Sequence, residues 1–132
     1  MTTTNLVHTA GNQALPLDDD LADLLDRLAG VHPGIDLMRE GIRLLALDHH
    51  DTDQTQTVIA FLAGSSDGTD ILTALAHLIA RLSNADTNPS LRTLPLDRQK
   101  TAQHHGEQAQ FHLTDDWLHQ HASEASAAID GV

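Results

Sequence analysis

Residues 71–82 read ILTALAHLIARL, and this stretch decides the fold class of the chain. Its large apolar residues follow steps of one or three positions, which return to one side of a helix with 3.6 residues per turn. They are Ile71, Leu72, Leu75, Leu78, Ile79 and Leu82. The pattern predicts a helix from Asp70 to Ser83 that is buried on one side, with Thr69 as its cap.

Similar but weaker patterns lie on both sides of this stretch. Asp18–Asp20 offer capping oxygens to a first helix, whose stripe is Leu21, Leu24, Leu25 and Leu28, and Gly30 is its stop signal. A broad apolar pattern predicts a second helix from Ile35 to about Asp48. A third helix is expected after a cap at Thr52 or Asp53, and a last one after Thr114.

These patterns predict an all-α protein, a compact bundle of four to five short helices. The apolar residues are mostly Leu and Ala, and aromatic residues make up 2% of the chain, which disfavours a β-sheet core. Residues 1–16 are read as a flexible leader and residues 17–132 as one helical domain. Within that domain, the polar composition of residues 84–110 predicts a long polar loop, or a weakly ordered segment, before the last helix. The alternative is a polar helix from Asp97 to about His105.

Composition excludes several classes of function. A formal net charge of −12 repels nucleic-acid phosphates and anionic lipid headgroups, so direct binding to nucleic acid or membrane is not expected. The chain has no cysteine, which excludes disulfides, thiolate metal sites and thiol nucleophiles. No apolar run is long enough to span a bilayer, and Met1–Ala14 lacks the features of a secretory signal. The expected location is the cytoplasm.

One group of residues has the chemistry of a metal site. His49, His50, Asp51 and Asp53 place imidazole and carboxylate groups within five positions. These ligand types suit zinc, manganese or iron, and a histidine beside a carboxylate can act as a general base. The structural alternative is that the histidines bond to carbonyls at a helix end and face solvent.

A second set of histidines could respond to pH. It comprises His104, His105, His112, His119 and His121. Together these side chains would gain several positive charges as the pH falls from about 7 to about 5.5. His119 and His121 point to different sides of one helix, so they are not expected to share a metal ion.

No phosphate-binding loop, dinucleotide motif or nucleophile elbow occurs in the sequence, so no cofactor and no catalytic residue is expected. We therefore expect a non-catalytic protein-interaction or regulatory module, which binds another, basic protein and forms a homodimer. Its core or interface residues would be Leu21, Leu25, Leu28, Leu75, Leu78 and Leu82. Two alternatives remain: a metal-binding protein or metal-dependent hydrolase that uses the His49 group, and a DNA mimic that binds a DNA-binding protein.

Overall fold

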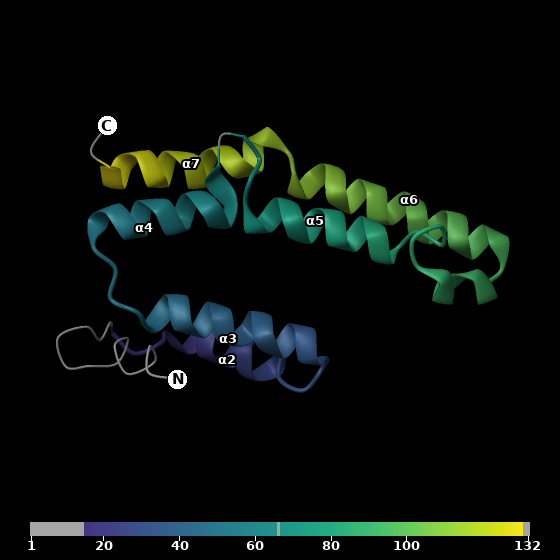
Figure 1. The fold of residues 1–132 in the computed structure, drawn as a ribbon, viewed down its shortest axis with the longest axis horizontal. Coiled ribbons are helices and arrows are strands. Elements are labelled where there is room, and N and C mark those ends of the chain that lie inside the picture. The colour runs from purple at the N-terminus through teal and green to yellow at the C-terminus, as the bar shows by residue number, and fades with distance from the viewer. Residues whose placement is uncertain (1–14, 66, 131–132) are drawn as a thin grey trace. The chain divides into compact units, whose positions relative to one another are not determined.

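The computed structural model of the chain describes residues 15–65 and 67–130, which form helices joined by turns (Figure 1). No β-strand occurs within these two ranges, so the all-α prediction is confirmed. Contacts divide the chain into two units, Met1–His50 and Asp51–Val132. That residues 17–132 form one domain stays a prediction from the sequence. The predicted flexible leader lies outside the described residues, apart from Leu15 and Pro16.

The first unit contains helix α2 (Asp19–Arg27) and helix α3 (Pro33–Leu47). Asp18 caps α2 as predicted, because its carboxylate accepts a hydrogen bond from the Leu21 amide. The chain turns after α2 at Gly30, whose φ of +78° is a conformation that favours glycine. His32 then caps α3 by accepting from the Gly34 amide, and Pro33 takes the first helical position.

Contacts between α2 and α3 hold the first unit together. The Arg39 guanidinium donates from Nε to the Leu25 carbonyl at 2.6 Å, and the Gly30 amide donates to the Asp36 carboxylate at 2.9 Å. Leu25 is 1% exposed and is the centre of this unit. The sequence predicted that α3 would be buried on more than one side, but within the described part of this unit no residue of α3 is buried.

The second unit begins with helix α4 (Thr52–Ile59), which continues into the π-helical turn η1 (Ala60–Gly64). The third predicted helix is therefore confirmed, but its cap is Asp51. Asp51 accepts from the Gln54 amide, and the Gln54 side chain accepts from the Asp51 amide. This reciprocal pair satisfies two amides at the helix start.

Helix α5 (Ile71–Leu82) matches the predicted helix, with Asp70 as its cap instead of Thr69. A short 3₁₀ turn, η2 (Pro89–Thr93), leads into helix α6 (Leu96–Leu113). The long polar loop predicted for residues 84–110 is thus wrong over its second half, and the alternative polar helix lies in the right place but is longer. Gln, Arg, Lys and Ala are good helix formers, so α6 needs no apolar stripe to be helical. Helix α7 (Asp116–Asp130) follows almost directly.

Two helix pairs build the second unit. Helix α5 lies along α6, while α4 and η1 lie along α7 (Figure 1). Both pairs approach closely at a glycine. A Cβ atom built on Gly106 of α6 would lie 2.5 Å from the Ser83 Cβ, and one built on Gly64 of η1 would lie 2.7 Å from the Ser123 backbone nitrogen. Small residues therefore set the distances between these helices.

Helices in the described part of the chain lack the combined length and apolarity that crossing a bilayer requires.

Candidate functional site

A buried histidine–aspartate link joins the three helices α5, α6 and α7. His119 of α7 places its Nδ1 3.1 Å from the Asp70 carboxylate and its Nε2 2.6 Å from the Leu113 carbonyl. The Asp70 side chain is 0% exposed, and its other oxygen accepts from the Thr73 amide at the start of α5. One imidazole ring thereby ties the start of α5 and the end of α6 to the first turn of α7.

Charge stabilises this link. The hydrogen bond to the Leu113 carbonyl raises the pKa of His119, burial opposes that shift, and the Asp70 carboxylate adds to it, so the pKa lies above its ordinary value. Burial raises the pKa of Asp70, but hydrogen bonds from Thr73 and the charge of His119 outweigh it, so the pKa lies below its ordinary value. Both shifts favour an imidazolium paired with a carboxylate.

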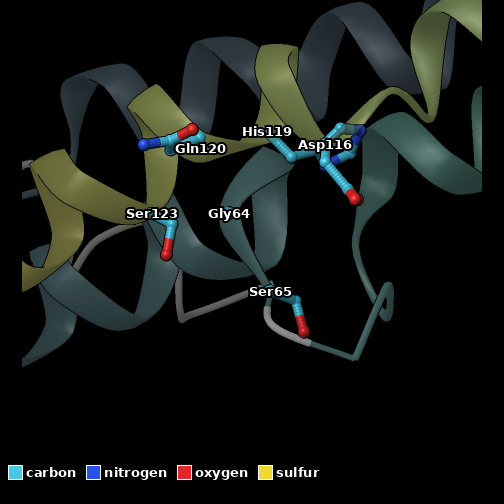
Figure 2. A pocket seen from close by; sticks show the side chains of 6 residues that line it. All are labelled: Gly64, Ser65, Asp116, His119, Gln120 and Ser123. Carbon is cyan, nitrogen blue, oxygen red and sulfur yellow. The ribbon is translucent and has the colours of Figure 1, made fainter.

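A small hollow lies beside this link. Its volume is about 150 Å³, and six residues line it: Gly64, Ser65, Asp116, His119, Gln120 and Ser123. Figure 2 shows that they come from the end of η1 and the first half of α7. Pockets that enclose small molecules usually measure about 300–1,000 Å³. The hollow is therefore large enough for a few water molecules but small for a substrate.

The side chains of His119 and Ser65 beside the hollow make hydrogen bonds that hold the fold together. A serine nucleophile needs a histidine nitrogen that is free to accept its proton. Both ring nitrogens of His119 instead face oxygen acceptors, and the Ser65 hydroxyl donates to the Asp67 carboxylate at 2.6 Å. The residues Ser65, His119 and Asp70 thus share a region of the fold without forming a proton relay.

The four predicted metal ligands have other partners or none. His50 Nε2 lies 2.8 Å from the Leu45 carbonyl at the end of α3, and Asp51 caps α4. His49 and Asp53 are exposed. Within residues 15–65 and 67–130, no three His, Asp or Glu side chains gather in a way that could hold a metal ion. The structure therefore shows the helix-end role for His50, while Asp51 and Asp53 belong to the other unit, so the metal site stays a prediction.

The six leucines predicted as core or interface differ in their exposure. Leu25 is core, while Leu78 is 40% exposed and Leu82 is 53% exposed. Leu21, Leu28 and Leu75 are half-buried. On α5, the fully buried residue is Ala76 at 0% exposure. The side of α5 that packs against α6 is thus made of small residues, and much of its leucine side is exposed.

Sequence reasoning placed His119 in a group of pH-responsive histidines but missed Asp70 as its partner. The two residues are 49 positions apart, and no local pattern connects them. Gly106 was missed because it lies in a polar stretch. An isolated glycine inside a helix is a signal for close packing, which could have been used.

The chain has no match among the family models, and neither a curated protein nor a solved structure matches it.

Proposed function

We propose that this chain is a non-catalytic, acidic helical module that binds protein partners through apolar helix faces. The observation that carries the proposal is the exposed leucine side of α5. Ile71 and Leu82, at the two ends of this helix, are 54% and 53% exposed, although they belong to the strongest apolar stripe in the sequence. Contiguous apolar surface of this kind is typical of protein-binding sites.

The buried groups support the same conclusion. Asp70 and His119 satisfy each other and the helix ends, so neither ring nitrogen of the histidine beside the small hollow is free to act as a base. The negative charge is also partly structural, since Asp18, Asp51 and Asp70 each cap a helix. The remaining surface carboxylates would attract a basic partner over long distances and so increase its rate of association.

The two alternative hypotheses have less support. A metal-dependent hydrolase would need the His49 group to converge on one ion. A DNA mimic would use the same surface carboxylates, and it would leave the exposed leucine side of α5 without a role. We therefore prefer apolar recognition, with charge as an aid to association.

The test compares three forms of the purified chain as bait for proteins from its own source. They are the wild type, the double variant Leu78→Glu/Leu82→Glu, and the control Leu96→Glu. Leu96 is 64% exposed and lies on α6, outside the α5 stripe. A tagged copy of the chain itself is included among the possible partners. We expect the wild type and the control to retain the same partner and the double variant to lose it.

Circular dichroism should show equal helix content for all three forms, and a captured protein counts once it binds the wild type in purified form. Equal binding by the wild type and the double variant would contradict the proposal. So would the absence of any partner, the chain itself included.

A further inference from the structure

The exposed side of α5 has a symmetric spacing. Ile71, Leu75, Leu78 and Leu82 follow steps of four, three and four, so the series reads the same from either end. Alternating steps of three and four form a seam along a helix, as in coiled coils. A seam with this symmetry can pair with a second copy of itself in antiparallel orientation, about a twofold axis through its middle.

Antiparallel pairing would match the seam side chain for side chain. Ile71 of one copy would lie opposite Leu82 of the other, and Leu75 opposite Leu78. Ile71, Leu78 and Leu82 are each at least 40% exposed, and Leu75 is half-buried beside them. The residues that such a pair needs are therefore accessible along the whole helix.

The charges of the second unit are separated along α5. Its Lys and Arg residues all lie where α5 ends and α6 begins: Arg81, Arg92, Arg98 and Lys100. Three acidic residues, Asp86, Asp97 and Glu107, lie at the same end, so four basic side chains leave it with one net positive charge. The opposite end of α5, where His119 joins it to α7, holds Asp67, Asp115 and Asp116.

This separation determines the favoured orientation. Parallel pairing of two α5 helices would place the basic ends together and the acidic ends together, which repel. Antiparallel pairing places the basic end of each copy beside the acidic end of the other. The charge pattern therefore favours the same orientation as the apolar seam.

We propose that α5 binds α5 of a second copy of this chain in an antiparallel, twofold-symmetric pair. The inference rests on the proposed function and names the partner of that function. The seam exposes a patch on the order of 300 Å² per copy. Two such patches bury less than the roughly 1,200 Å² of a standard stable interface. The pair is therefore expected to be weak and reversible.

Cysteine cross-linking tests the orientation, because the natural chain has no cysteine. Ile71→Cys is made with a purification tag and Leu82→Cys without one, and the two are mixed and treated with a short bis-maleimide. Antiparallel pairing brings position 71 close to position 82 of the other copy. It separates two copies of position 71 by about 16 Å along the axis, at 1.5 Å per residue.

We expect mixed, tagged-to-untagged products to exceed like-to-like products several-fold. The matched control mixes tagged Leu96→Cys with Leu82→Cys and should give a low, statistical yield. Each variant is also cross-linked alone. If either one then gives as much cross-linked dimer as the mixture does, the helices pair in parallel and the proposal is overturned.

Sedimentation equilibrium tests the pairing itself, at about 0.15 M salt, where charges separated by more than about 8 Å are largely screened. The mass of the wild type should rise from 14.2 kDa toward twice that value with concentration. Leu78→Glu should weaken the pair at least about tenfold, and Leu96→Glu by less than about twofold. A wild type that remains a monomer at about 200 µM overturns this inference.

The two proposals fail in different ways. If the wild type remains a monomer but binds another purified protein that the Leu78→Glu/Leu82→Glu variant does not bind, the proposed function stands and the self-pairing is wrong. If the chain binds neither itself nor another protein through α5, both are wrong.

Discussion

Helices α5 and α6 lie side by side, yet their sequences are opposites. Helix α5 is the most apolar of the described helices, and α6 is a polar helix with almost no stripe. They meet through Ala76, Ala80 and Ser83 on one side and Gly106 on the other, while leucines of α5 remain exposed. The comparison teaches that an apolar stripe does not by itself mark where two helices pack, and that small residues mark the contact between α5 and α6.

The largest effect is expected where a glycine meets backbone. A Cβ on Gly64 would lie 2.7 Å from the Ser123 backbone nitrogen and 2.8 Å from the Ala122 carbonyl carbon. Backbone atoms cannot rotate away, so η1 and α7 would have to separate. We expect Gly64→Ala to lower the free energy of unfolding by about 3 kcal/mol, measured by urea denaturation. A change below about 1 kcal/mol would mean that small residues do not control this packing.

A smaller loss is expected at the start of α5. Asp70→Ala removes the cap from the Thr73 amide and the carboxylate from His119. We expect the free energy of unfolding to fall by about 2 kcal/mol, of which about half is the lost cap. Asp70→Asn retains an oxygen for the cap and should lose less. Equal losses for the two variants would show that the cap contributes little.

Substitution of Gly106, which lies at the contact between α5 and α6, tests how closely the two helices pack. Gly41 of α3, which has open space around it, is the control. Gly106→Ala must displace Ser83, which costs more than the gain in helix propensity, so we expect a net loss of about 1 kcal/mol. Gly41 of α3 has no atom within 4 Å of a built Cβ. Gly41→Ala should therefore stabilise the chain by up to about 1 kcal/mol. Stabilisation by both variants in thermal melts would contradict close packing at Gly106.

The link between His119 and Asp70 predicts how stability depends on pH. The pKa of His119 is raised above 6.5, so its contribution is complete below that pH and is lost as the pH rises through the raised value. The pKa of Asp70 is lowered below 3.8, so its contribution is present above that pH and is lost on further acidification. The link is most stabilising between these two values.

We therefore expect the melting temperature of the wild type to fall more between about pH 6 and about pH 8 than that of Asp70→Asn. In that variant His119 loses the carboxylate that helps to raise its pKa. Scanning calorimetry at the two pH values measures the difference. If the melting temperature falls equally in the wild type and in the variant, other groups control the pH dependence.

The smallest effect on stability is expected on the exposed side of α5. Leu82 is 53% exposed, so Leu82→Glu should change the free energy of unfolding of the dilute monomer by less than about 0.5 kcal/mol. The matched contrast is Leu25→Ala in α2, which removes a core side chain and should cost about 2–5 kcal/mol. A large loss from Leu82→Glu at low concentration would show that the stripe is part of a monomer core.

Helix positions were predictable from sequence wherever a capping residue preceded an apolar stripe, as for α2 and α5. Helix α6 was largely missed because its residues favour helix without forming a stripe. The candidate site was harder to predict. Asp70 was read as the first residue of a helix, and His119 as one of several surface histidines. Their pairing depends on the turn between α6 and α7, which brings the start of α7 beside the start of α5, and no local sequence pattern predicts that turn.

By itself, the sequence determined that this protein is helical, acidic and without thiol chemistry, because backbone propensity, caps and composition act locally. Only the tertiary structure decided which side of α5 is covered and which histidine carries a buried charge. Those outcomes depend on how closely two backbones approach, and that distance is set by Gly64 and Gly106 at contacts between residues far apart in the chain. The same leucines could otherwise have formed a core, and here they form a surface.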